Sequence, residues 1–184
     1  MINIHTYDTS GQSKQDIKQI LMENLANYLN KPCSHIKINT NKNGKPFTDG
    51  LFFSISHCRN KLIQVFSTDG DGEVGIDIEY KNSKRNYLKL AKRYFHINEY
   101  EHMQSLAKHE AIVLFYKLWT TKEAYCKYRG GTLWHFLEDN FLDDENTIVN
   151  KRKEVYLKEF NLYTNYAMSL ATTTFSTSEI IKHD

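Results

Sequence analysis

Residues 73–80 read EVGIDIEY, a stretch with the alternating pattern of a β-strand. Its β-branched Val and Ile residues stand at every second position, which predicts a strand with one buried face. The same alternation places Asp77 and Glu79 side by side on the opposite face, where Gly75 lets a backbone or a ligand approach closely. Such a pair of carboxylates either faces water from an edge strand or binds a divalent cation, because Mg²⁺ is commonly held by one or two carboxylates together with substrate phosphates.

The composition predicts a globular protein. The 184 residues are 40% apolar and 13% aromatic, enough for one domain or for two small halves that share a core. The opening MINIHTYDTS lacks the basic start and apolar segment of a signal peptide, and no apolar run approaches the ~20 residues of a membrane helix, so we expect a cytoplasmic protein without a membrane partner. The three cysteines are odd in number and lack zinc-binding spacing, which indicates free thiols in a reducing compartment.

Charge is concentrated in one segment. The net charge is only +2, but residues 81–95, KNSKRNYLKLAKRYF, gather basic side chains directly after the strand. Such a run attracts an acidic protein or a nucleic acid, or it forms the solvated face of a helix.

Hydrophobic periodicity predicts a mixed order of helices and strands. Apolar residues three and four positions apart predict helices over Ser13 to Leu29 and Ala111 to Tyr128, with a basic helix before the second. Short β-branched runs predict strands over 37–40, 51–55, 62–67, 154–160 and 166–173. KLIQVFST at 61–68 and YAMSLATT at 166–173 would be the last strands of two similar halves, and DGDG at 69–72 is a turn suited to a boundary. We therefore predict an N-terminal half over 1–72 and a C-terminal half over 73–184.

The second long helix carries a cluster of charged residues, LWTTKEAYCKYRGG at 118–131. Lys122 falls within the apolar stripe of this helix, where a lysine is costly unless a cleft or a counter-ion receives it. Glu123 lies one residue on, with Trp119 four residues before it and Lys127 four after it. The pattern indicates a carboxylate between two lysines at the inner edge of the helix, although a Glu–Lys pair on a surface has the same spacing.

A third cluster suits phosphate binding. Lys45 lies in a Gly-Lys-Pro turn, and Ser56 and His57 stand where a strand ends, so their donors can reach a phosphate. A Ser-His pair is also common in local hydrogen bonding, and a serine hydrolase is not indicated because no GxSxG motif accompanies the pair.

Together these motifs resemble the 4′-phosphopantetheinyl transferases, in particular the larger type exemplified by the surfactin-synthetase-activating enzyme. Order and spacing match in GKP at 44–46, SH at 56–57, VGIDIE at 74–79 and WTTKEAYCK at 119–127. AKRYFHINEYE at 91–101 also resembles a family segment, with Glu99 at its acidic position.

The resemblance implies an α+β fold of two similar α/β halves with pseudo-two-fold symmetry, each a small, mostly antiparallel sheet packed on a long helix. It also implies transfer of 4′-phosphopantetheine from coenzyme A to a serine of an acidic acyl or peptidyl carrier protein. In this reading one Mg²⁺ is held by Asp77, Glu79 and Glu123 and orients the pyrophosphate for in-line attack.

The other roles also come from the resemblance. Glu123 would be the general base, directly or through a metal-bound water, and Lys127 and Lys122 would stabilise the developing phosphate charge. Coenzyme A would be held at its nucleotide end by Lys45, Ser56 and His57. The family's smaller members, about half this size, form trimers whose sites lie between subunits, so a chain that holds both contributions is expected to be a monomer with its site between its halves.

One departure and two alternatives accompany this resemblance. The larger enzymes begin with an extra basic segment, whereas this chain reaches its first helix almost at once, with only Lys14 and Lys18 as substitutes. Another Mg²⁺-dependent enzyme acting on a nucleotide pyrophosphate, such as a hydrolase, would need the same kinds of residue, carboxylates for the metal and cations for the phosphates. A nucleic-acid-binding module would use the 12 tyrosines, the 10 phenylalanines and the basic run, but the acidic residues would repel phosphate, so we expect no nucleic acid partner.

Overall fold

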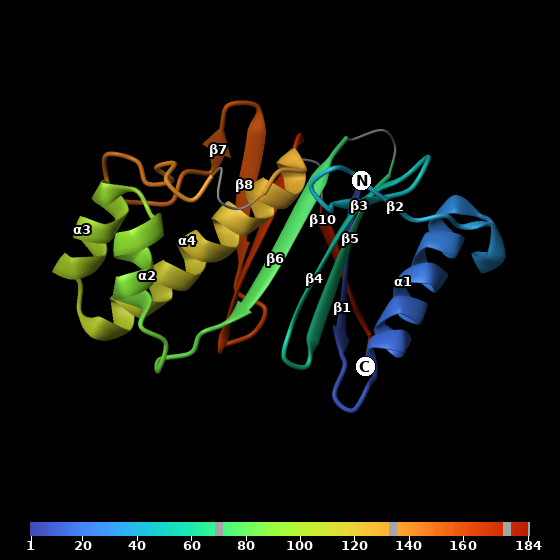
Figure 1. The fold of residues 1–184 in the computed structure, drawn as a ribbon, viewed down its shortest axis with the longest axis horizontal. Helices are drawn as coiled ribbons and strands as arrows, with labels where there is room; N and C mark the ends of the chain where they lie inside the picture. The colour runs from blue at the N-terminus through green and yellow to red at the C-terminus, as the bar shows by residue number, and fades with distance from the viewer. Residues whose placement is uncertain (69–71, 133–135, 175–177, 184) are drawn as a thin grey trace.

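The computed structural model describes residues 1–68, 72–132, 136–174 and 178–183. Two four-stranded sheets form the middle of the molecule, with a long helix on the outer face of each (Figure 1). The layers therefore run helix, sheet, sheet, helix, and two further helices lie beyond the second long helix (Figure 1). The apolar faces of the two sheets meet in one cluster, which includes Ile4 and Val65 from the first sheet and Ile76 and Leu170 from the second.

The first sheet has the strand order β10-β1-β5-β4. Its strands are β1 (Ile2–Asp8), β4 (Phe52–Cys58), β5 (Lys61–Ser67) and β10 (Ser178–His183). Neighbouring strands are antiparallel except that β10 runs parallel to β1, with Ile4 opposite Ile180. The sequence predictions missed both β1 and β10, whereas the helix predicted over Ser13 to Leu29 is confirmed as α1 (Lys14–Leu29), which follows β1.

The second sheet has the order β6-β9-β8-β7 and is antiparallel throughout. Its strands are β6 (Val74–Tyr80), β7 (Lys151–Arg152), β8 (Val155–Phe160) and β9 (Tyr166–Thr172). The strand predicted from EVGIDIEY is confirmed as β6, an edge strand of this sheet. Asp77 lies opposite Ser169 in the register of β6 and β9.

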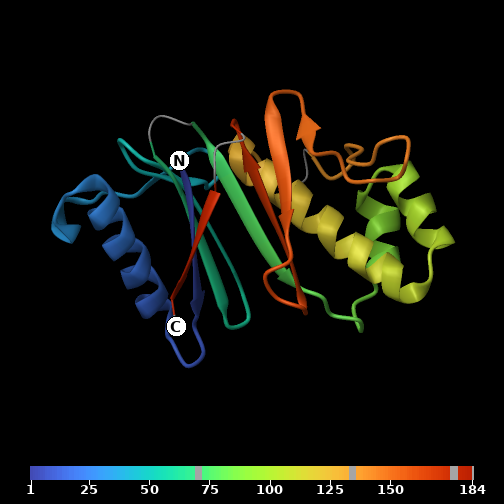
Figure 2. The same ribbon diagram turned by 180° about the vertical axis from the view of Figure 1, so that it is seen from behind.

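The two halves repeat one arrangement of strands and helix. In the first, β1 is followed by helix α1 (Lys14–Leu29) and the hairpin β4–β5; in the second, β6 is followed by helix α4 (Lys108–Arg129) and the pair β8–β9. The last strand of each unit pairs with the other two, so β5 and β9 are equivalent inner strands. The predicted α+β fold of two similar halves is confirmed. β10 lies outside this repeat and joins the sheet of the first half (Figure 2), while the boundary between 1–72 and 73–184 stays a prediction.

Local sequence explains where the long helices begin and end. Ser13 caps the start of α1, where its Oγ accepts the Asp16 N–H and the Asp16 carboxylate accepts the Ser13 N–H. The helix predicted over Ala111 to Tyr128 is confirmed as part of the longer α4. Gly130 caps the end of this helix, and its φ of 62° is the left-handed conformation that glycine readily adopts.

The remaining elements are short. They are α2 (Tyr87–Tyr94), α3 (Ile97–Ser105), the 3-10 turn η1 (Cys33–His35), and the hairpin of β2 (Asn39–Thr40) and β3 (Pro46–Phe47). Three of the four residues in the predicted turn at 69–72 lie outside the described residues. No helix in the described part of the chain has the length and apolar character to cross a membrane.

Gly75 positions α4 against β6. A Cβ atom at Gly75 would lie 2.0 Å from the Ala124 carbonyl oxygen and 2.4 Å from the Tyr128 backbone nitrogen. A larger side chain would therefore push the helix away from the strand, and the predicted close approach of a backbone at Gly75 is confirmed. Because Asp77 and Glu79 share the Gly75 face of β6, this contact brings the helix to the two carboxylates.

Candidate active site

Side chains of β4 join the two halves at the edge of β6. The Ile76 N–H donates to Ser54 Oγ at 3.2 Å, the Ile78 N–H donates to Ser56 Oγ at 3.3 Å, and the Tyr80 N–H donates to Cys58 Sγ at 3.3 Å. Alternate residues of a strand point to one face, so these three side chains form a row along β6. The row satisfies backbone donors of β6 at the boundary between the halves.

Asp77 is held firmly through one of its two carboxylate oxygens. Its Oδ1 accepts hydrogen bonds from Ser56 Oγ and from Lys127 Nζ, both at 2.8 Å. Its Oδ2 is buried and has no hydrogen-bond partner within the described residues. A buried carboxylate oxygen without a partner is costly, and it marks a position where a cation or a donor from a ligand would be stabilised.

Lys127 connects α4 to this strand. Its Nζ donates to the Ile76 carbonyl at 3.0 Å as well as to Asp77, and 28% of its side chain is exposed. The ammonium group therefore neutralises the charge of the Asp77 carboxylate, and the Lys127 side chain remains partly accessible to solvent.

Glu123 and Glu79 complete a group of three interacting carboxylates. Burial raises the pKa of Glu123 to about 7; repulsion from Asp77 and Glu79 adds to this, and Lys127 opposes it. Burial also raises the pKa of Glu79, again with a contribution from Asp77 and with Arg85 and Lys127 opposing. The three carboxylates thus destabilise one another's charges, which a bound cation would relieve.

A cavity of about 380 Å³ lies beside this group and is shared by the two halves. From the first half it is lined by the 43–46 loop and part of β4, including Lys45 and Phe53, and from the second by Glu123, Cys126 and Lys127. The Lys45 ammonium pairs with the Glu73 carboxylate and also donates to the carbonyls of Val74 and Tyr128, at 3.4 and 3.3 Å. The structure therefore brings two of the predicted cationic residues, Lys45 and Lys127, to one cavity.

Ser56 and His57 have different surroundings. Successive residues of a strand point to opposite faces, and Ser56 points to Asp77 whereas His57 is exposed on β4 opposite Leu62. Neither residue lines the cavity that contains Lys45. The structure brings Ser56 to the carboxylates and leaves His57 apart from them.

Lys122 does not lie with the other predicted site residues. Its side chain and that of Glu99 are both 0% exposed, and its Nζ lies 2.9 Å from the Glu99 carboxylate. It also donates to the carbonyls of Leu137 and Asp139, so its three hydrogens have three acceptors. The prediction that Lys122 needs a counter-ion is confirmed, but a role in stabilising phosphate charge does not fit this buried position.

Two residues of the site were missed from the sequence. Glu73 pairs with Lys45, and Arg85 lies near Glu79, close enough to lower the Glu79 pKa. Glu73 directly precedes β6, but no sequence pattern links residue 73 to residue 45.

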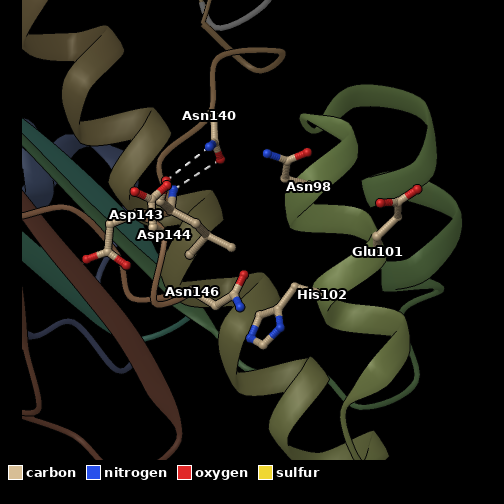
Figure 3. Close-up of a pocket in the computed structure, with 8 residues that line it drawn as sticks. Asn98, Glu101, His102, Asn140, Asp143, Asp144 and Asn146 are labelled. Carbon is tan, nitrogen blue, oxygen red and sulfur yellow. Dashed lines mark hydrogen bonds between the residues drawn. The ribbon is translucent and has the colours of Figure 1, made fainter.

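A polar pocket elsewhere is a poor candidate for a phosphate-bearing ligand. It has a volume of about 480 Å³ and lies between α3 and the 140–146 loop (Figure 3). Figure 3 shows Glu101 and His102 on the helix side and Asp143 and Asp144 on the loop side. The described residues of its lining include neither lysine nor arginine, so its carboxylates would repel an anion.

The described part of the chain contains no ready-made metal site. Within the described ranges, no group of three or more His, Cys, Asp or Glu side chains is placed so that it could hold a metal ion. Mg²⁺ nevertheless needs only one or two protein carboxylates when water and phosphate supply the rest. The unpartnered Asp77 Oδ2 and the raised pKa values of Glu79 and Glu123 make these residues chemically suited to such a cation.

Comparisons with known proteins match the same region of the chain. The family model described as "4′-phosphopantetheinyl transferase superfamily" matches residues 73–173, more than half of the chain and the part that contains Asp77, Glu79 and Glu123. The 4′-phosphopantetheinyl transferase gsp of Aneurinibacillus migulanus is 32% identical over 156 residues, which cover 82% of this chain and 64% of the relative.

Two other relatives have similar identities over shorter segments. HetI of a Nostoc species is 33% identical over 117 residues, covering 60% of this chain and 48% of the relative. Sfp of Bacillus subtilis is 36% identical over 103 residues, covering 54% of this chain and 44% of the relative. Both are named 4′-phosphopantetheinyl transferases. The aligned chain spans about half to two thirds of the length of these curated relatives.

Proposed function

Because the chain belongs to the 4′-phosphopantetheinyl transferase superfamily, we propose that it transfers the 4′-phosphopantetheine group of coenzyme A to a serine of an acyl or peptidyl carrier protein. The products are the holo-carrier protein and adenosine 3′,5′-bisphosphate, as in a holo-[acyl-carrier-protein] synthase. The bond that breaks joins the two phosphorus atoms of the pyrophosphate through oxygen, and the bond that forms joins the serine oxygen to the phosphorus on pantetheine.

One observation carries this proposal. Carboxylates of β6 and α4 interact at the boundary between the halves, directly beside a cavity with Lys45 on one side and Lys127 on the other. Cations around a cavity of about 380 Å³ suit a ligand that bears several phosphates. Acidic residues that would otherwise repel those phosphates suit a bridging divalent cation.

The metal would be Mg²⁺, held by Asp77, Glu79 and Glu123. When bound, it would neutralise charge on the pyrophosphate and so make the bond to pantetheine's phosphorus easier to break. The unpartnered Oδ2 of Asp77 is the oxygen best prepared for this, because Lys127 and Ser56 already fix the other oxygen.

Glu123 is the residue we assign to the serine proton. Glu123 lines the cavity, and in the absence of metal burial and repulsion from Asp77 and Glu79 raise the pKa of its carboxyl to about 7, which makes its carboxylate a stronger base than an exposed one. Lys127 would stabilise the negative charge that develops on the phosphate oxygens. Lys45 would contact the nucleotide end directly from the cavity, whereas Ser56, whose Oγ donates to Asp77, and the exposed His57 lie outside the cavity lining and would contact the nucleotide end only beyond it.

The protein would act as a monomer in the cytoplasm, with an acidic carrier protein as its macromolecular partner. Both halves of one chain line the cavity, so the proposed site needs no second copy. The cysteines of the structure are free thiols, as a reducing compartment would keep them.

The test is mass spectrometry of apo-acyl and apo-peptidyl carrier proteins incubated with this protein, coenzyme A and Mg²⁺. We expect a mass increase of one phosphopantetheine group on the carrier serine, and none when that serine is replaced by alanine. A parallel reaction without carrier protein distinguishes a hydrolase, which would release phosphopantetheine unaided. Hydrolysis in that reaction, with no modified carrier protein in the first, would contradict the proposal.

A further inference from the structure

The loop that carries Lys45 is organised by the side chain of Asn41. Asn41 Oδ1 accepts the N–H groups of Asn43 and Lys45, both at 2.9 Å. The Asn41 backbone N–H donates to the Lys45 carbonyl at 2.9 Å, and its carbonyl accepts the Gly44 N–H at 3.0 Å. One residue therefore closes the turn from both its backbone and its side chain.

The same side chain attaches the loop to the other half of the molecule. Asn41 Nδ2 donates to the carbonyl of Gly130, the residue that caps the end of α4, at 3.0 Å, and Asn43 Nδ2 from the same loop donates to this carbonyl at 2.8 Å. The fit is close, because a Cβ atom at Gly130 would lie 2.9 Å from Asn41 Nδ2 and 3.5 Å from Lys45 Cδ. The loop of the first half thus rests on the last turn of the helix that carries Glu123 and Lys127.

This attachment determines where the Lys45 ammonium lies. With its backbone held by Asn41, the Lys45 side chain reaches the Tyr128 carbonyl in the last turn of α4. The carbonyl end of a helix favours a cation. Lys45 borders the cavity from this position, paired with the Glu73 carboxylate, which a phosphate would have to replace.

We propose that Asn41 is a positioning residue that holds Lys45 at the end of α4 and thereby sets the affinity of the cavity for the phosphates of coenzyme A. The inference rests on the proposed function. Asn41 itself acts on the loop, so its replacement should raise KM for coenzyme A and leave kcat within about twofold, since the carboxylates on β6 and α4 keep their places.

The experiment measures binding of coenzyme A by titration calorimetry in the presence of Mg²⁺, and transfer kinetics in parallel. Asn41→Ala should weaken binding about fivefold to thirtyfold, the value of one or two hydrogen bonds. Asn41→Asp keeps an acceptor for the turn but loses one of the two side-chain donors to the Gly130 carbonyl, while Asn43 keeps the other, so it should weaken binding as well. Asn39→Ala is the matched control: Asn39 is exposed on the same hairpin, and its replacement should change nothing.

A double-mutant cycle with Lys45→Ala separates positioning from a general effect on the fold. If Asn41 acts through Lys45, adding Asn41→Ala to Lys45→Ala should weaken binding by less than about twofold more. Equal losses in both backgrounds, or unchanged binding in Asn41→Ala and Asn41→Asp, would overturn the inference. Absence of coenzyme A binding in the unaltered protein would instead overturn the proposed function, and that measurement comes first.

Discussion

Two lysines of helix α4 pair with carboxylates of other elements, and the surroundings of each pair determine whether it can bind a ligand. Lys122 pairs with Glu99 in the core of the second half, and Lys127 pairs with Asp77 at the boundary between the halves. The two lysines are five residues apart, which places them about 140° apart around the helix. One pair is fully enclosed, whereas 28% of the Lys127 side chain is exposed.

The pairs differ in what remains unsatisfied. Lys122 has three acceptors, and Glu99 accepts the N–H groups of Phe141 and His96 in addition to Lys122. Asp77, in contrast, has a buried oxygen without a partner in the described part of the structure. A buried pair whose donors and acceptors are all satisfied has none left for a ligand, whereas a pair with an unused acceptor beside a cavity can bind one.

The largest expected effect is on stability and comes from breaking the enclosed pair. Lys122→Met should lower the free energy of unfolding by about 3–5 kcal/mol, because Glu99 is left buried without its cation. Urea denaturation measures this. The control Lys117→Met breaks the partly exposed pair of Lys117 and Glu159 and should cost at most about 1 kcal/mol. The double variant Lys122→Met/Glu99→Leu should recover much of the loss, and failure to recover would show that the pair itself is not the cause.

Replacing carboxylates at the boundary between the halves should lower the transfer rate and not the free energy of unfolding. Asp77→Ala or Glu123→Ala should reduce the transfer rate about 100-fold or more at saturating Mg²⁺, because each removes a proposed metal ligand. Circular dichroism should show an unchanged fold. Near-normal turnover of Asp77→Ala would show that the metal is not held there.

The pH dependence of stability sharpens the comparison further. The pKa of Glu123 is about 7 in the folded protein against an ordinary value of 4.5, so the folded state binds this proton more tightly than the unfolded state. The resulting stabilisation is present below about pH 4.5 and is lost as the pH rises through 7. Without metal, the difference between the melting temperature of Glu123→Gln and that of the unaltered protein should therefore shift in favour of Glu123→Gln as the pH rises from 5 to 8.

Mg²⁺ provides the counter-test for Glu123. Because the ion competes with the proton, added Mg²⁺ should raise the melting temperature of the unaltered protein more at pH 8 than at pH 5, and less in Glu123→Gln. A melting-temperature difference between Glu123→Gln and the unaltered protein that is independent of pH would exclude Glu123 as the titrating group.

The smallest effect is expected from replacing exposed cations on α2. Lys89 and Arg93 are exposed and one turn apart on α2, in the basic run that follows β6. Reversing both to Glu should slow association with an acidic carrier protein by about threefold to tenfold at low salt and reduce its salt dependence. Stopped-flow association rates measure this, and an unchanged rate at low salt would assign the approach of the carrier protein to another surface.

Local patterns in the sequence correctly predicted the elements that carry the site. Alternation identified β6 with its two carboxylates, and helical periodicity identified α4 and the unusual place of Lys122 in its apolar stripe. The strands β1 and β10 were missed because each contains only two isoleucines, a weak local signal for a strand, and their pairing with each other is visible only in the structure.

Sequence periodicity therefore predicts the direction of the side chains within each element: Asp77 and Glu79 share a face of a strand, and Lys122 and Lys127 diverge on a helix. The partners of these side chains depend on how the elements pack against one another. Glu99 reached Lys122 because α3 packs beside α4, and Ser56, not His57, reached Asp77 because β4 lies along β6. The period of a helix or strand depends on backbone geometry alone, whereas contacts between elements depend on how their apolar faces pack together, which no single segment encodes.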